Sequence, residues 1–389
     1  MSNIVGSFAK AKKQMISKEW KYLDLILLGA VGALSVLGCA MVYSASRSRA
    51  LAQGLSSTYY LERQIAFVIL GIILMVGTML IDYRKMRDLS LFLYIAIIGA
   101  LGLVLVPGIG SSANGTQGWF ALPGGFQLQP SEFSKFLLII ALASYISQHE
   151  QFYFNALIKT LIVGMLPVGL VLLQPDLGTA MVMVVILIAM LCVAGTRGRY
   201  LVLMALVGLV SVIGVLQLGV LKSYQINRLT VFLNQGNGAN ASADSQASAY
   251  NLDQSKTAIG NGGLLGKGIF NGEQTKLSYV PEQHTDFIFT AIGEELGFIG
   301  SITVIALFAI VAWRVWRISR AAPDSAGTFI CIGIVAMFVF HVFENIGMTM
   351  GIMPITGIPL PLISYGGSSI LLMFMSIGLV NNIYIHRFE

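Results

Sequence analysis

Charged residues are scarce in this chain. Asp, Glu, Lys and Arg make up only 11% of its 389 residues, whereas 56% are hydrophobic and the mean hydropathy is +0.78. A water-soluble domain normally has about a quarter of its residues charged. The composition therefore excludes a water-soluble globular protein and indicates a polytopic membrane protein, most of whose surface faces lipid.

Cysteine is scarce too, which limits the kinds of site that the chain can build. The three cysteines lie in separate apolar runs and are too few and too dispersed for a disulfide framework or a zinc site: Cys39, Cys192 and Cys331. We expect them to be small buried hydrophobic residues. His284 has no second histidine at ligand spacing, so a metal site built from His and Cys is not expected.

The positions of the basic residues argue against a nucleic-acid partner, although the net charge is +6. With a cytoplasmic N-terminus, the inner segments hold fifteen Lys and Arg and the outer loops hold eight, five of them in one long loop where the positive-inside rule is weak. The charge therefore predicts topology, with both termini in the cytoplasm. A phosphate-binding loop is also excluded, because Asn261 and Gly268 stand where the motif around Lys267 requires Gly and Ser or Thr.

Ten apolar windows are long enough to cross a bilayer. They predict an all-α membrane protein with about ten transmembrane helices in a single domain over residues 1–389, preceded by a basic cytoplasmic segment at 1–21. The first window is kept as a helix rather than a removable signal. The windows are 22–44, 65–82, 89–107, 132–148, 155–173, 176–194, 199–221, 285–312, 327–350 and 364–386. The boundary at Gln174-Pro175-Asp176 could instead be a kink in one long helix.

Three segments between the windows are rich in Gly and Pro, which predicts irregular or re-entrant backbone: Pro107 to Ser131, the long extracytoplasmic loop 222–283 between helices 7 and 8, and Met353 to Ser369. Within the long loop, the polar stretch Asn234 to Ala249 is expected to be flexible. Tyr250 to Ile259 has helical spacing.

A polar stretch from Val280 to Gly297 carries most of the functional information. Glu282, His284 and Asp286 lie within five residues, directly before an apolar helical pattern. Acidic residues at a membrane helix are costly and usually functional. The alternative is that Thr285 or Asp286 only caps the helix, which typically contributes about 1 kcal/mol.

Further acids occur inside the apolar windows. Glu294 and Glu295 recur near the face of Asp286, and we expect at least one of them to form a buried ion pair, with Lys135 as the nearest counter-charge. Glu132 lies one turn from Lys135, and Asp176 and Glu344 complete a set that we expect to line a polar cavity. Two residues have open alternatives: Trp119 is an interfacial anchor or part of a mobile lip, and Arg228 binds an anion or snorkels.

Five ordered motifs resemble the SEDS family (shape, elongation, division, sporulation), to which the rod-shape protein RodA and the division protein FtsW belong. They are QPSEFSK (129–135), QPDLGT (174–179), PEQHTDFIF (281–289), GEELG (293–297) and GIPLPLISYGGSS (357–369). The resemblance covers nearly the whole chain. Within the family, GNGGLLGKGIFNGEQ and the short ends resemble the elongation type, RodA, with FtsW as the near relative. Gln117-Gly118-Trp119 departs from the family, where many relatives have Arg before Trp.

The resemblance implies a peptidoglycan glycosyltransferase that polymerises lipid II at the outer face of the bacterial inner membrane. It implies a class B penicillin-binding protein and the elongation machinery as partners. The family's essential loop aspartate corresponds to Asp286, and its supporting Glu, Lys and Asp to Glu132, Lys135 and Asp176. The motifs and their surroundings also give a supporting or substrate-binding set: Trp119, Arg228, Glu282, His284, Glu294 and Ser364.

These residues suggest an inverting mechanism. Asp286 would act as general base on the acceptor 4-hydroxyl, and Lys135 or Arg228 would balance the departing undecaprenyl pyrophosphate. The sequence requires no cofactor, although Mg or Mn could contribute. The alternatives are a lipid II flippase or transporter, because intramembrane charges and broken helices suit that class too, a scaffold for the penicillin-binding protein, and a division-type, FtsW-like polymerase.

Overall fold

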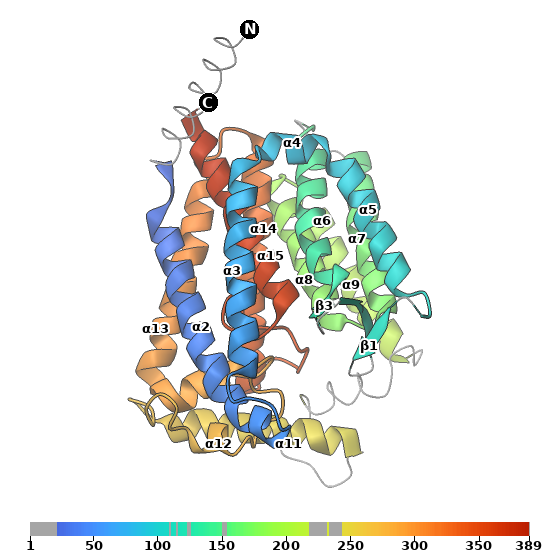
Figure 1. Cartoon of the computed structure of the whole chain (residues 1–389). Coiled ribbons are helices and arrows are strands. Elements are labelled where there is room, and N and C mark those ends of the chain that lie inside the picture. Colours follow the sequence, from blue (N-terminus) through green and yellow to red (C-terminus); the bar gives the residue numbers. More distant parts are fainter. Residues whose placement is uncertain are drawn as a thin grey trace.

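The computed structural model describes residues 22–108, 110–113, 116–122, 126–149, 154–217, 232 and 243–388. Long helices run lengthwise beside one another and dominate these residues (Figure 1). They are α2 (Leu25–Ala52), α3 (Tyr59–Leu80), α5 (Ser90–Val104), α6 (Pro130–Ile146), α7 (Phe154–Leu173), α8 (Leu177–Val193), α9 (Gly198–Gln217), α13 (Ile288–Ser319), α14 (Ser325–Met350) and α15 (Gly367–Ile385).

Each apolar window of the sequence coincides with one of these helices, which confirms a polytopic helical membrane protein. Among the described residues, six helices are long and apolar enough to cross a bilayer, and three shorter apolar helices cover Ser90–Val104, Leu177–Val193 and Gly198–Gly208. The count of ten spans stays a prediction. Gln174-Pro175-Asp176 separates two helices rather than kinking one, because α7 ends at Leu173 and Asp176 caps α8.

The bundle has two distinct ends. At the terminal end lie α4 (Tyr83–Asp88), η4 (His386–Phe388) and the start of α2, where the rings of Tyr22 and Phe388 are 5.5 Å apart. At the opposite, loop end lie the strands together with α11 (Ala243–Gly262) and α12 (Glu273–Lys276) (Figure 1). The first and last described residues thus lie at one end, as two cytoplasmic termini require. Their side of the membrane stays a prediction.

The expectation of irregular backbone between Pro107 and Ser131 is wrong. Three short strands pair antiparallel in the order β1-β2-β3, with Phe120 opposite Leu128: β1 (Ser111–Ala113), β2 (Thr116–Leu122) and β3 (Phe126–Leu128). Glycine-rich connections also suit hairpins, and strand pairing satisfies backbone groups that an irregular segment would leave open. The all-α fold therefore carries a small sheet at its loop end.

The long loop between α9 and α13 is more helical than its composition indicates. The helix expected at Tyr250 to Ile259 is confirmed within α11, but α11 begins at Ala243, inside the stretch expected to be flexible. Residues 233–242 lie outside the described part of the chain. α11 packs against α13 and α14, burying Leu252 and Ala258, and these tertiary contacts outweigh its polar composition.

A break in α13 holds the glycine-rich part of the long loop, residues 263–268, against the helix. Gly297 has φ 67° and ψ −163° inside the helix, which interrupts the hydrogen-bond ladder. The glycine-rich turn supplies the missing partners: Lys267 N and Gly268 N donate to the carbonyls of Glu294 and Glu295, and Phe298 N donates to Gly263 O. The backbone approaches so closely that a Cβ on Gly266 would lie 2.1 Å from Glu295 O. This close packing of the turn on the backbone of α13 explains the glycines around Lys267, which do not form a phosphate-binding loop.

The three cysteines are free. Cys331 is buried, as expected, whereas Cys39 is only half-buried and Cys192 is exposed on the protein surface.

Candidate active site

Asp286 lies in a turn that precedes α13 at the loop end. The helix begins at Ile288, and its N-cap is Phe287, whose side chain makes no capping hydrogen bond. The capping alternative for Thr285 or Asp286 is therefore wrong: Thr285 Oγ1 instead donates to Glu282 O at 3.0 Å. Asp286 is half-buried, so its carboxylate is partly accessible at the end of the bundle.

The segment between α14 and α15 forms one wall beside this carboxylate. Gly357 has φ +79°, and a Cβ placed on it would lie 3.1 Å from Oδ2 of Asp286. A side chain at position 357 would therefore crowd the carboxylate, and the positive φ also favours glycine. A glycine at position 357 therefore leaves Oδ2 of Asp286 uncrowded by a side chain.

His284 is buried against aromatic rings. Its ring lies 4.7 Å from that of Tyr60 and 5.7 Å from that of Tyr365, and its carbonyl accepts from Tyr365 N at 2.9 Å. Burial lowers the pKa of His284 to about 4, an effect that Glu282 opposes and Arg49 reinforces. The imidazole is therefore neutral near pH 7 and packs the turn against α3 and the 351–366 segment.

Glu282 joins the same turn to α2. Its Oε1 lies 2.8 Å from Nη2 of Arg49, and both side chains are part-exposed. Arg49 could not be singled out from its sequence position, because it is only one of several basic residues near the end of an apolar window. Such a pair contributes little stability in water, about 0–1 kcal/mol, but it orients the two side chains at the rim.

Glu294 and Glu295 have structural partners, and the expected ion pair with Lys135 is wrong for both. Glu294 accepts from Gln274 N, Thr275 N and Thr275 Oγ1 at 2.8, 3.0 and 2.7 Å. Glu295 accepts from Ser44 Oγ of α2 and, at 3.0 Å, from Phe270 N. Neutral donors on α12 and its neighbours satisfy these carboxylates because the kink in α13 brings the loop onto them.

Lys135 pairs instead with Glu132, as the spacing of the two residues predicted. Their side chains are almost fully buried, with Nζ 2.7 Å from Oε1. Nζ also lies 3.0 Å from Nε2 of His341 on α14, and His341 Nδ1 lies 2.7 Å from Met337 O. Because a carbonyl can only accept, Nδ1 carries the proton and Nε2 accepts from Lys135. His341 was missed, although a histidine inside an apolar window is itself a signal.

Asp176 connects two of the sequence motifs. It caps α8 by accepting from Thr179 N at 2.9 Å, and its other oxygen accepts from Gln129 Nε2 at 3.2 Å. Gln129 N in turn donates to Ser368 Oγ at 3.0 Å, so three motifs meet at the loop end. Glu344 accepts from Thr356 Oγ1. A common polar cavity for all these acids stays a prediction.

The remaining predicted residues are placed as follows. Ser364 is buried, and its Oγ accepts from Leu360 N at 2.9 Å, so it braces the turn that carries it. Trp119 is half-buried in β2, and its carbonyl accepts from Ser111 Oγ at 3.0 Å. Arg228 lies outside the described residues. In the described part of the chain, no three His, Cys, Asp or Glu side chains are grouped to hold a metal ion.

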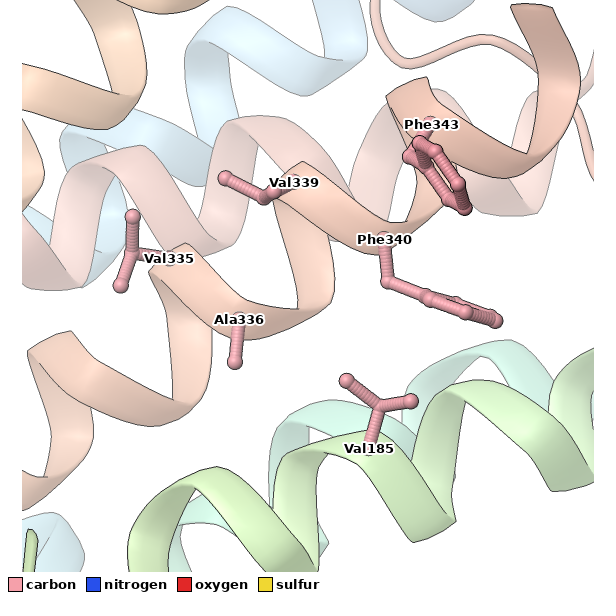
Figure 2. A pocket seen from close by; sticks show the side chains of 6 residues that line it. All are labelled: Val185, Val335, Ala336, Val339, Phe340 and Phe343. Carbon is pink, nitrogen blue, oxygen red and sulfur yellow. The ribbon is translucent and has the colours of Figure 1, made fainter. Parts of the chain in front are cut away.

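An apolar groove of about 320 Å³ lies between α8 and α14. Figure 2 shows Val185 of α8 facing the α14 side chains that line it: Val335, Ala336, Val339, Phe340 and Phe343. Phe343 immediately precedes Glu344 on α14. The groove therefore runs along α14 toward the end of this helix that contacts the loop segments around Asp286.

Known proteins resemble this chain along almost all of its length. The sequence profile of the FtsW, RodA and SpoVE family, described as "Cell cycle protein", matches residues 25–389. A probable peptidoglycan glycosyltransferase FtsW of Trichlorobacter lovleyi is 39% identical over 92% of this chain and 92% of its own. Stage V sporulation protein E of Bacillus subtilis is 38% identical over 92% of this chain and 96% of its own.

Solved structures agree. A chain from a peptidoglycan synthase complex, described as coordinating polymerization and crosslinking, superposes with a TM-score of 0.78 at 29% identity, covering 94% of this chain and 99% of that one. The rod shape determining protein RodA of Thermus thermophilus superposes with a TM-score of 0.68 at 27% identity, covering 94% and 98%. The chain is thus a multi-pass membrane protein that belongs to the SEDS family, the family of FtsW, RodA and SpoVE.

Proposed function

We propose that this protein is a peptidoglycan glycosyltransferase that polymerises lipid II at the outer face of the bacterial inner membrane. The observation that carries the proposal is the setting of Asp286. It stands at the loop end of a membrane bundle, ahead of a helix that it does not cap, beside a glycine that leaves its carboxylate accessible. Relatives named as peptidoglycan glycosyltransferases support the reaction class.

In the proposed step, Asp286 takes the proton of the acceptor sugar's 4-hydroxyl. The hydroxyl oxygen bonds to C1 of the donor sugar as the C1–O bond to the undecaprenyl pyrophosphate breaks, so a single displacement inverts C1. A positioned general base typically accelerates such a step by about 10²–10⁴, or roughly 3–5 kcal/mol of barrier.

The departing pyrophosphate needs positive charge. Lys135 was expected to supply it, but its ammonium is buried and compensated by Glu132, so we assign this pair to holding α6 against α14. Arg49 of α2 is a better-placed cation, because its side chain is part-exposed and pairs with Glu282 in the turn that carries Asp286. A divalent cation, Mg or Mn, would neutralise pyrophosphate when bound.

The apolar groove between α8 and α14 suits an isoprenoid chain (Figure 2). Its lining offers hydrocarbon contacts only, and it follows α14 toward the segment that flanks Asp286. An undecaprenyl tail lying there would leave its pyrophosphate near the loop end.

For partners, we propose a class B penicillin-binding protein, which the solved peptidoglycan synthase complex supports. The elongation type was inferred from the segment around Lys267. The relatives found by sequence are named FtsW and SpoVE, which supports a division or sporulation role at least as well. We therefore propose the family reaction without assigning it to elongation.

The test is strand synthesis from lipid II by purified protein with its partner. Asp286→Asn should lower the rate about 10²–10⁴-fold without changing the thermal unfolding midpoint. The matched control is Asp253→Asn, an exposed aspartate on α11 at the same end, which should leave the rate unchanged. Near-normal synthesis by folded Asp286→Asn would refute the base. Lipid II movement across vesicles without polymerisation would favour the transporter alternative.

A further inference from the structure

Asn345 of α14 holds the two segments that flank the carboxylate of Asp286. Its side chain is fully buried, and Nδ2 donates to Asp286 O and to Ile358 O, both at 2.8 Å. An amide nitrogen carries two hydrogens, so each carbonyl receives one. One side chain therefore links the turn before α13 with the segment between α14 and α15.

The two carbonyls belong to the two segments that lie beside the carboxylate of Asp286. One belongs to Asp286 itself. The other belongs to Ile358, the neighbour of Gly357, whose Cβ position would be 3.1 Å from Oδ2 of Asp286. Asp286 precedes the N-cap Phe287, so the hydrogen-bond ladder of α13 does not fix its carbonyl. Asn345 fixes it from another helix.

The orientation of the Asn345 amide gives Nδ2 two acceptors but leaves Oδ1 unsatisfied within the described part of the chain. Oδ1 of Asn345 is buried without a hydrogen-bond partner among the described residues. A buried acceptor without a partner is unfavourable, so the orientation is maintained by the two bonds that Nδ2 makes. The neighbouring Glu344 accepts from Thr356 Oγ1 and provides a second attachment for the same segment.

We propose that Asn345 is a positioning residue for the reaction, which sets where the Asp286 carboxylate stands relative to the acceptor hydroxyl. The inference rests on the proposed function of Asp286. Because a misplacement of about 1 Å can cost about 10²-fold in rate, loss of the two bonds should lower kcat about 10–100-fold. The KM for lipid II should change little, since Asn345 is buried and does not touch substrate.

The critical variant is Asn345→Asp, which keeps the shape but sets a carboxylate oxygen against two carbonyl oxygens. Asn345→Ala serves as a second variant that adds no charge. The matched control is Asn382→Asp. Asn382 is an equally buried asparagine at the terminal end, where Nδ2 donates to Met79 O at 2.8 Å and Oδ1 accepts from Tyr83 N at 3.0 Å.

All variants are compared by thermal unfolding and by turnover per folded molecule, with lipid II as the probe. We expect Asn345→Asp and Asn382→Asp both to unfold at lower temperature, while only the Asn345 variants lose kcat. Equal kcat per folded molecule for Asn345→Asp, Asn345→Ala and Asn382→Asp would overturn the proposal, since the role of Asn345 would then be stability alone.

A double variant separates this inference from the function on which it rests. If Asn345 acts through Asp286, adding Asn345→Ala to Asp286→Asn should lower the residual rate by less than twofold. A full further 10–100-fold loss in the double variant would show that Asn345 acts independently and overturn the positioning role. Failure of the proposed function has a different signature, because Asp286→Asn alone would then retain its turnover.

Discussion

Asp24 and Asp286 each precede a long helix at opposite ends of the bundle, and their surroundings differ completely. Asp24 caps α2 by accepting from Leu27 N at 3.0 Å, and it pairs with Arg314 of α13, with Nε at 2.8 Å from Oδ2. It is 2% exposed. Asp286 does not cap α13 and stays partly accessible. An aspartate at a helix start therefore has a structural role where it both caps the helix and pairs with a buried cation.

Other helix starts follow the pattern of Asp24. Asp82, Asp176 and Asp324 are N-caps whose side chains accept from backbone N–H groups of α4, α8 and α14. Asp324 also accepts from the hydroxyl of Tyr83 at 2.9 Å. Asp286 is the exception among these aspartates, because it precedes α13 without being the N-cap of that helix. Substitutions at these carboxylates should separate those with a structural role from the one proposed to act in the reaction.

The largest effect on stability is expected from Asp24→Asn. The amide can still cap α2, but it leaves the buried guanidinium of Arg314 without its counter-charge. Removing one member of a buried ion pair typically costs about 3–5 kcal/mol. Denaturant unfolding in detergent should show this loss, whereas turnover per folded molecule should stay normal. An unchanged unfolding midpoint would mean that the Asp24–Arg314 ion pair does not stabilise the bundle.

Acid should weaken the loop end through His284. Its folded pKa is about 4, against 6.5 for an ordinary histidine, so between these pH values the unfolded chain binds more protons than the folded one. Stability is therefore retained above pH 6.5 and falls as the pH drops toward 4, by about 3 kcal/mol. Unfolding measured from pH 7 to 4 should show this slope in the wild-type protein. His284→Phe should lack this contribution, and an identical slope in that variant would assign it to other groups.

A smaller effect is expected from Glu294→Gln, eight residues beyond Asp286. The carboxylate accepts from two N–H groups and one hydroxyl near α12, and an amide can replace only part of this acceptor capacity. We expect a loss of about 1–3 kcal/mol, measured by thermal unfolding. The rate per folded molecule should not change. A rate loss as large as that of Asp286→Asn would move Glu294 into the chemistry.

Much of the architecture could be predicted because its signals are local. Apolar windows mark the helices, since every backbone group in a bilayer must find its partner within the segment. Glu132 and Lys135 were expected to pair because residues three apart face one another on a helix. The sheet and the start of α11 were not foreseen, because contacts with other elements decided them.

The candidate site was likewise predictable from the sequence only in part. Asp286 stood out because an acid beside an apolar helix is costly, but whether it capped that helix depended on where α13 begins. The partners of Glu294 and Glu295 depended on the break at Gly297, which brings a distant loop onto them. No spacing rule connects Asn345 with Asp286 and Ile358, which it joins across three separate segments.

The sequence by itself determined the membrane class and the helices, and it singled out Asp286 as the acid proposed for the chemistry, because hydropathy and local polarity are properties of short stretches. The tertiary structure alone decided which carboxylates have structural partners, such as Asp24 and Glu294, and that Asp286 lies half-buried beside Gly357. The distant partners are Arg314 for Asp24, Thr275 for Glu294 and Asn345 for Asp286. They lie 290, 19 and 59 positions away in the sequence, and only folding brings them within about 3 Å.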